Sequence, residues 1–176
     1  MVVPGERAIT VRAATAEDRQ AAVAFISSAT ARGRASLALL RAGQGLLWTA
    51  VEGEGAGAGA QEGAEEKLVG LLLATAQIDA ESEQAIGYIQ ELLVHSAYRR
   101  LGVAMHLLDA AEHFFLAQQD FAQVALVTSP DNEAALSLYR SRGYAVAQVR
   151  LTKSRTGGTP SAEEGSAAEE SSRLRQ

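Results

Sequence analysis

The sequence predicts a single α/β domain built around a mixed, mostly antiparallel sheet. The chain has 176 residues, of which 47% are hydrophobic, so one domain can bury a core of its own. In the first half of the chain, strand-like apolar runs follow one another directly, which favours antiparallel pairing. In the second half, a strand–helix–strand pattern favours a right-handed crossover between parallel strands.

The first half is predicted to contain two helices and three strands. An alternating run at residues 9–12 predicts the first strand, and Thr15 with Asp18 three residues later resembles a capping box at a helix start. The apolar residues of that helix are Ala21, Ala22, Phe25 and Ile26. A short helix at 34–41 and apolar strands at 46–51 and 68–76 complete this half.

The last two of these strands are joined by a segment rich in Gly, Ala and Glu at residues 52–66. It contains five glutamates and no basic residue, and its composition predicts a flexible linker. One interpretation is a surface insertion in place of a tight turn, because the entropy cost of closing a loop grows slowly with its length. The other is an acidic flap that attracts a cationic substrate.

The second half begins with a predicted strand at 85–94, whose central stretch carries one charged residue, Glu91. The helix that follows places four apolar residues on one stripe, which predicts packing against the sheet. These residues are Val103, Leu107, Ala111 and Phe115. A strand at 124–127, a helix at 132–142 and a strand at 144–151 follow.

We place the domain at residues 8–152. The tail at 153–176 is dominated by Gly, Ser, Ala, Pro and Glu and is predicted to be disordered.

Composition argues against several classes of function. The net charge of −5 disfavours a nucleic-acid-binding surface. The absence of cysteine excludes disulfides and thiolate ligands, and the three histidines have no ligand spacing, so we predict no metal. No apolar run approaches a membrane span of about 20 residues, and the start of the chain lacks a secretion signal. We therefore expect a cytoplasmic protein with no membrane partner, while import into an organelle stays open.

The most informative segment runs from Glu91 to Ala104, where an apolar strand ends in Arg99-x-x-Gly102-x-Ala104 and a helix begins. The first turn of a helix leaves about four N–H groups without partners at its positive end, which suits a diphosphate. Gly102 permits unusual backbone angles, and Arg99 and Arg100 add positive charge. Taken alone, the same residues also fit plain helix capping.

A second motif, Asn132 to Tyr144, follows the strand at 124–127. Asn132 is a good N-cap, and Gly143 supplies a helix stop. Ala135, Leu138 and Tyr139 fall at i, i+3 and i+4 and share one helical face.

Together, in this order and at this separation, the two motifs resemble the GNAT superfamily of acyl-CoA-dependent N-acyltransferases. The resemblance covers residues 8–152 and implies a sheet with a splayed central strand pair, into which acyl-CoA fits. Main-chain groups of Leu92 and Val94 would bind pantetheine, while the turn would hold the pyrophosphate. By the same resemblance, the remaining cofactor-binding residues are Arg99, Arg100, Leu101, Gly102, Val103, Ala104, Asn132 and Tyr139.

The resemblance also implies catalytic roles. The N–H of Leu92 would polarise the thioester carbonyl, and Tyr139 would donate a proton to the departing thiolate. Glu91 is our candidate base for the incoming amine, and Tyr88 could line the acceptor pocket. The alternatives are a packed aromatic side chain for Tyr139, and a solvent-facing or arginine-paired carboxylate for Glu91.

The expected function is acetyl-CoA-dependent N-acetylation of a primary amine in a ternary complex, because no nucleophile for an acyl-enzyme is recognisable. The acceptor could be a protein N-terminus, a lysine side chain or a small-molecule amine. The alternative is a catalytically inactive acyl-CoA-binding regulatory module. We expect a monomer or a homodimer.

Overall fold

The computed structural model describes residues 8–29, 34–53, 66–79 and 83–147 of the chain. Its elements, in chain order, are β1 (Ala8–Ala13), α1 (Ala16–Ala29), α2 (Arg34–Arg41), β2 (Leu46–Gly53), β3 (Lys67–Ile78), β4 (Ala85–Val94), the 3₁₀ helix η1 (Ser96–Tyr98), α3 (Val103–Leu116), β5 (Phe121–Leu126) and α4 (Glu133–Ser141). The chain divides into two compact units between Leu138 and Tyr139, and the sheet with α1, α2 and α3 belongs to the first. None of the helices in these ranges is long and apolar enough to cross a membrane.

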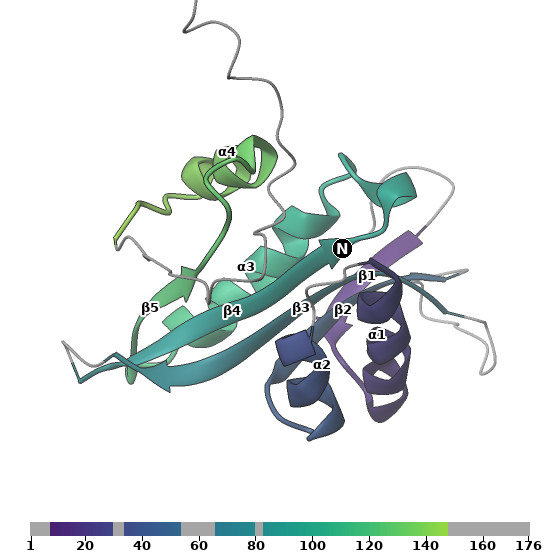
Figure 1. Cartoon of the computed structure of the whole chain (residues 1–176), viewed down its shortest axis with the longest axis horizontal. Coiled ribbons are helices and arrows are strands. Elements are labelled where there is room, and N and C mark those ends of the chain that lie inside the picture. The colour runs from purple at the N-terminus through teal and green to yellow at the C-terminus, as the bar shows by residue number, and fades with distance from the viewer. Residues whose placement is uncertain (1–7, 30–33, 54–65, 80–82, 148–176) are drawn as a thin grey trace, which may run out of the picture. The chain divides into compact units, whose positions relative to one another are not determined.

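The five strands form one sheet in the order β1-β2-β3-β4-β5 (Figure 1). The first three pairs of neighbours are antiparallel, and β4 pairs with β5 in parallel. Parallel neighbours need a long connection, and here α3 supplies it. The predicted mixed, mostly antiparallel sheet is therefore confirmed.

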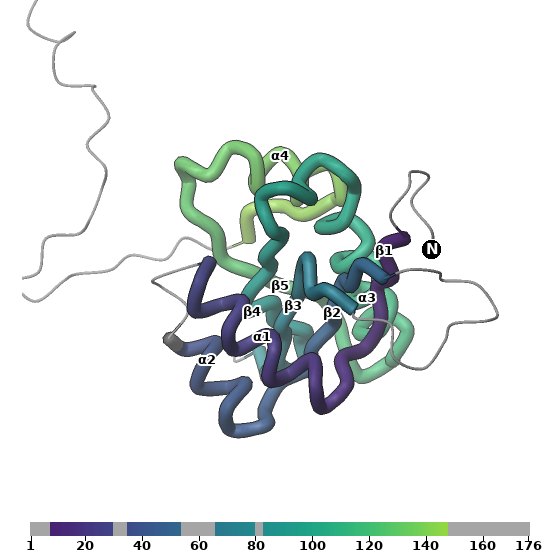
Figure 2. The backbone as a smooth tube through the Cα atoms, turned by 90° about the vertical axis from the view of Figure 1, so that its right-hand side faces the viewer, coloured from purple at the N-terminus to yellow at the C-terminus, as the bar shows by residue number. Residues whose placement is uncertain are grey.

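Helices α1 and α2 cover one face of the sheet, and α3 covers the other (Figures 1 and 2). The buried core of the first face is formed by Ala22, Ile26, Leu40, Leu47, Leu71 and Leu73. Each large aliphatic side chain in this set contributes about 1.5–3 kcal/mol by leaving water. Ala21 is exposed, because one step along a helix turns the side chain by about 100°.

The other core lies between α3 and the sheet. The buried residues of α3 are Val103, Leu107, Leu108, Ala111 and Phe115, which include the whole predicted stripe. The Phe115 ring packs against Trp48 and Phe121, with ring centroids 6.1 and 5.0 Å away. On the sheet side, a Cβ at Gly87 would lie 2.5 Å from the Phe115 ring, so only glycine permits this close approach.

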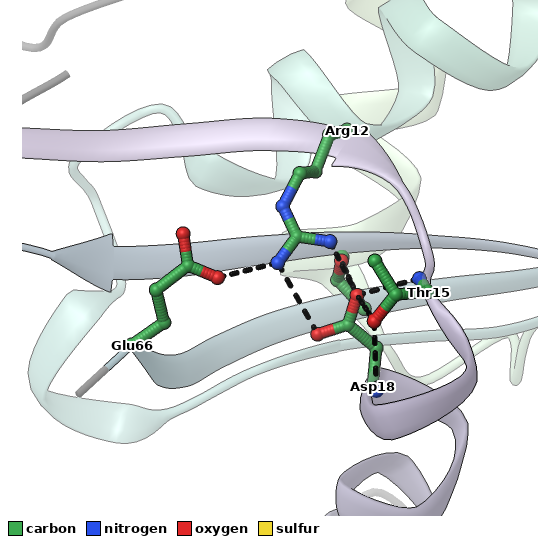
Figure 3. Close-up of polar contacts among 5 residues, drawn as sticks. Arg12, Thr15, Asp18 and Glu66 are labelled. Carbon is green, nitrogen blue, oxygen red and sulfur yellow. Dashed lines mark hydrogen bonds and ion pairs between the residues drawn. The ribbon is translucent and has the colours of Figure 1, made fainter. Parts of the chain in front are cut away.

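A polar network at the end of β1 fixes the start of α1 (Figure 3). The N–H of Asp18 donates to Thr15 Oγ1 (3.3 Å), and the N–H of Thr15 donates to Asp18 Oδ2 (2.7 Å), which is the predicted capping box. Arg12 donates to Asp18 and also to Glu66 Oε2 (2.5 Å). Burial alone would raise the pKa of Asp18, but the hydrogen bonds from Thr15 and Arg12 outweigh it and hold the pKa below its ordinary value of 3.8.

The last predicted strand, at 144–151, is wrong over its described part, because residues 144–147 are irregular. The N–H of Tyr144 instead donates to Tyr139 O and that of Gly143 to Arg140 O, both at 3.0 Å. With φ +86° at Gly143, these bonds form a Schellman motif that ends α4. Residues 148–151, the tail at 153–176 and the insert from 54 to 65 lie outside the described residues, so the predicted domain limits stay predictions.

Candidate active site

The pairing between β4 and β5 ends halfway along β4. The last paired residues are Ile89 on β4 and Leu126 on β5, yet β4 continues to Val94. Residues 91–94 of β4 pair with β3 on one edge, and residues 90–94 pair with no other described strand on the opposite edge. The splayed central strand pair is therefore confirmed.

A β-bulge lies at the point where the two strands part. Glu91 pairs with Leu73 and Ile89 pairs with Ala74, so the register skips Gln90 as an extra residue, although its side-chain amide donates to Thr75 Oγ1 on β3 (3.0 Å). A bulge bends its strand and increases the local twist. The extra residue therefore gives a physical reason for β4 to leave β5 at this position.

The main-chain groups of Leu92 and Val94 point to the open edge of β4. The N–H of His95 donates to Val69 O on β3 (2.8 Å), and successive residues of a strand direct their main-chain groups to alternate edges. At this open edge the Val94 carbonyl accepts a long bond from Arg99 Nε (3.5 Å). An extended ligand that contains amides could add to such an edge as a strand does.

The turn between β4 and α3 has an unusual backbone. The φ angle is positive at Arg100 (+65°) and at Gly102 (+80°), and Gly102 is the N-cap of α3. Glycine adopts this region freely, whereas a residue with a side chain pays about 1–2 kcal/mol. The left-handed angle at Gly102 agrees with the expectation for glycine there, and the strained angle at Arg100 was not foreseen.

The backbone amides of this turn are not used by the fold. The N–H groups of residues 100–105 donate no hydrogen bond within the described part of the chain, and that of His106 is the first to bond back, to Gly102 O (3.1 Å). The ring Nδ1 of His106 lies 2.7 Å from the same oxygen. The first turn of α3 contains no acidic residue, and the exposed side chains of Arg99 and Arg100 precede it. This combination favours an anion.

Tyr98 anchors the turn to the sheet. Its side chain is 2% exposed, and its hydroxyl donates to Glu52 Oε2 (2.5 Å). Lys67 is the cross-strand neighbour of Glu52 in the register of β2 and β3. Its Nζ lies 5.5 Å from the centre of the Tyr98 ring. The sequence analysis missed these residues, because the contact joins positions 46 residues apart and no local pattern indicates it.

Glu91 is half-buried and lies on the face of the sheet covered by α1 and α2, like its cross-strand partner Leu73. Its Oε2 accepts a hydrogen bond from the Oγ of Ser36 on α2 (2.9 Å). Among the described residues the hydrogen-bond partner of Glu91 is this serine and not an arginine, and the side chain is partly exposed, so its role as the base stays a prediction. Glu91 thus immediately precedes Leu92 on the strand that leads to the turn at Gly102.

Asn132 caps α4, with its Oδ1 accepting from the N–H of Ala135 (3.2 Å). Farther along the helix, Tyr139 is half-buried and its ring centroid lies 5.7 Å from that of Tyr144. Tyr139 is the first residue of the second compact unit, so its part in the site belongs to the proposal below.

Across the described ranges, no group of three or more His, Cys, Asp and Glu side chains is arranged to hold a metal ion. That the protein needs no metal stays a prediction.

Known proteins were compared by sequence and by fold. The sequence profile of the Acetyltransferase (GNAT) family matches residues 33–144, well over half of the chain. No curated protein sequence matches.

Several solved structures share the fold. The aminoglycoside N-acetyltransferase AAC(6')-Iy in complex with CoA is 14% identical, with a TM-score of 0.66 over 88% of this chain and 99% of that one. A putative acetyl transferase from Pyrococcus furiosus is 20% identical (TM-score 0.61), and an acetyltransferase from Trypanosoma brucei is 18% identical (TM-score 0.58). Each covers 84% of this chain and 99% of its own.

The profile match and the shared fold agree with the parted strands and the glycine turn described above. The chain therefore belongs to the acetyltransferase (GNAT) family and is an N-acetyltransferase.

Proposed function

We propose that the protein transfers the acetyl group of acetyl-CoA directly to a primary amine in a ternary complex. One observation carries the proposal: the open edge of β4 ends in a turn whose backbone N–H groups at 100–105 have no described partner. An extended chain that ends in a diphosphate would use both features at once. Acetyl-CoA has this form, since its pantetheine arm carries two amides and its nucleotide end carries a pyrophosphate.

In this proposal the pantetheine arm pairs with the open edge of β4 at Leu92 and Val94. The long bond from Arg99 Nε to Val94 O (3.5 Å) would give way, because a ligand amide at normal distance is a better donor to that carbonyl. The freed guanidinium would then be available to the phosphates. The amides from Arg100 to Ala104 would bind the pyrophosphate, and Asn132 would add a contact on the CoA side.

The chemistry needs a neutral amine, a polarised thioester and a proton for the leaving thiolate. Glu91 takes a proton from the amine, directly or through water, and the amine nitrogen then attacks the acetyl carbon. The N–H of Leu92 donates to the carbonyl oxygen as negative charge develops there. As the C–S bond breaks, Tyr139 gives its proton to the sulfur and CoA leaves as the free thiol. The amide nitrogen then returns its extra proton to the tyrosinate, and Glu91 releases the proton taken from the ammonium form of the amine to solvent.

The similar structures support small-molecule amines as one acceptor class. AAC(6')-Iy was solved with CoA and with the bisubstrate analog CoA-S-monomethyl-acetylneamine. Those ligands belong to that protein, and the sequence of this chain leaves protein N-termini and lysine side chains equally open. The acceptor is therefore tested as a panel.

The panel consists of neamine, spermine, free lysine and a peptide with an unblocked N-terminus. Each amine is incubated with acetyl-CoA and enzyme, with detection of free thiol and of the acetylated product by mass. CoA release with a matching mass gain supports the enzyme and identifies the acceptor class. Binding of acetyl-CoA without release across a broadened panel would instead favour the inactive acyl-CoA-binding module.

Two further measurements test the mechanism. Initial velocities with both substrates varied should give intersecting lines for a ternary complex, and parallel lines would indicate an acyl-enzyme. Tyr139→Phe should lower kcat more than acetyl-CoA affinity, because it removes the proton donor and keeps the ring. Unimpaired kcat in assays limited by chemistry would remove Tyr139 from the acid role.

A further inference from the structure

Ser36 is a buried polar residue whose placement the fold alone does not explain. Its side chain on α2 is 4% exposed. Two other polar or charged residues are buried in the described ranges, Asp18 and Thr49. Both belong to the network that caps α1, in which Thr49 Oγ1 lies 3.4 Å from Asp18 Oδ2. Ser36 lies outside that network, and its hydroxyl donates to Glu91 Oε2 instead (2.9 Å).

The direction of this bond is fixed by chemistry. An ionised carboxylate only accepts hydrogen bonds, so the serine hydroxyl must be the donor. A buried hydroxyl also costs about 1–3 kcal/mol when it has no partner, so Ser36 is held to Glu91 rather than free to rotate away. The contact joins positions 55 residues apart and ties α2 to β4.

The bond leaves the two carboxylate oxygens of Glu91 in different environments. Oε2 is occupied by Ser36, whereas no hydrogen bond to Oε1 is found within the described part of the chain. The Gln90 bulge comes immediately before Glu91 in β4, and Leu92, the expected contact of the thioester carbonyl, comes immediately after. A long, flexible side chain in this position gains directional precision from a fixed donor.

We propose that Ser36 is a positioning residue for the acetyl transfer reaction. Its hydroxyl holds Oε2 of Glu91 so that Oε1 receives the proton of the incoming amine. The inference rests on the proposed function, in which Glu91 is the base. It also gives α2 a role in catalysis through a side chain that itself touches neither substrate.

The first test is spectroscopic and needs no acceptor. In protein labelled with 13C-carboxyl glutamate, the Glu91 signal is assigned by its absence in Glu91→Gln. Ser36→Ala should shift this signal and Ser36→Thr, which keeps the hydroxyl, should leave it close to the wild-type position. The matched control is Ser27→Ala, because Ser27 is an exposed serine on α1 whose hydroxyl, within the described residues, donates to its own helix at Val23 O (2.8 Å). An unmoved Glu91 signal in Ser36→Ala would overturn the inference.

The second test is kinetic and uses the panel amine that releases CoA. Ser36→Ala should lower kcat about tenfold, as expected for loss of a hydrogen bond to a charged group, with KM for acetyl-CoA within about twofold of wild type. Ser27→Ala should change neither constant, and Ser36→Thr should recover most of kcat. Urea unfolding of every variant shows that the comparison concerns folded protein.

A double-mutant cycle separates this inference from the proposed function. If Ser36 acts through Glu91, Ser36→Ala should lower kcat in the wild-type background and have no further effect in Glu91→Gln. Suppose that Glu91→Gln lowers kcat strongly. The positioning role alone is then overturned if Ser36→Ala leaves kcat unchanged, and also if Ser36→Ala lowers kcat equally in the wild-type and Glu91→Gln backgrounds. An unchanged kcat in Glu91→Gln would remove Glu91 as the base and the inference with it.

Discussion

Replacing Gly102 by alanine probes the proposed coenzyme turn without adding charge. Gly102 has φ +80° and ψ 0°, so alanine there carries a strain of about 1–2 kcal/mol. Its Cβ would also lie 3.3 Å from Cε1 of His106, whose Nδ1 bonds to Gly102 O (2.7 Å). The turn is therefore pushed away from the conformation that gathers its amides. We expect acetyl-CoA to bind about 5- to 30-fold more weakly, because each 1.4 kcal/mol of strain that binding must restore raises the dissociation constant tenfold.

Gly43→Ala is the matched control. Gly43 has φ +69°, and nothing lies within 4 Å of a Cβ built there, so alanine brings similar backbone strain with no clash. Gly43→Ala should lose about 1–2 kcal/mol of unfolding free energy in urea and no affinity. Gly102→Ala should lose less unfolding free energy, because its turn relaxes away from the strained conformation, and it should lose affinity in isothermal titration, because acetyl-CoA binding must restore that conformation. Gly102→Glu adds bulk and a negative charge and should bind more weakly still.

The result that would refute the reasoning is specific. If Gly102→Ala is less destabilised than Gly43→Ala, as a relaxed turn requires, but binds acetyl-CoA as tightly as wild type, the amides that follow Gly102 do not hold the pyrophosphate. If Gly43→Ala loses as much affinity as Gly102→Ala, the effect reports general strain and the turn has no special role.

Three further predictions follow from the packing and the polar contacts. Gly87→Ala should lower the unfolding free energy in urea by about 1–3 kcal/mol, because its Cβ would lie 2.5 Å from the Phe115 ring, and an unchanged midpoint would contradict that packing. Because folding lowers the pKa of Asp18, its carboxylate stabilises the fold at pH values above the ordinary pKa of 3.8. This contribution is lost as the pH falls through the folded-state pKa. The urea midpoint should therefore fall in acid, and Asp18→Asn should flatten that fall, whereas equal slopes would show that other groups cause it. Tyr98→Phe loses the hydrogen bond to Glu52 and should therefore lower the unfolding free energy by about 1–3 kcal/mol and raise KM for acetyl-CoA. An unchanged KM in the folded variant would show that this hydrogen bond does not position the turn.

Most of the fold could be predicted because its signals are local. The capping box at Thr15, the stripe of α3 and the apolar run of β4 each show in a few neighbouring residues, and each element lies within a few residues of its predicted bounds. The predicted strand at 144–151 failed in its described part because Tyr144 instead bonds back to α4 to end that helix.

The site could be predicted only where its features are also local. Gly102 was recognisable because glycine and two arginines stand together at a helix start, and because the second motif at 132–144 follows at the separation that distinguishes this turn from plain helix capping. The contact between Ser36 and Glu91 and the contact between Tyr98 and Glu52 join residues 55 and 46 positions apart, so no sequence window contains both partners.

The Gln90 bulge is hidden from the sequence for a related reason. It is defined by the register between two strands, and β4 reads as an uninterrupted strand when taken alone.

The pairing of Glu52 with Lys67 at the base of the acidic insert has a practical consequence. Directly opposed antiparallel residues have Cα atoms about 4.5–5.5 Å apart, so the chain leaves and re-enters the sheet through nearly the same point. A foreign domain with adjacent termini could be spliced in there at little cost to the fold. Glu52 also accepts the bond from Tyr98. A spliced domain that spreads its termini on binding an analyte would therefore pull on Tyr98 and on the proposed coenzyme turn after it, and would convert analyte binding into a change of acetylation rate.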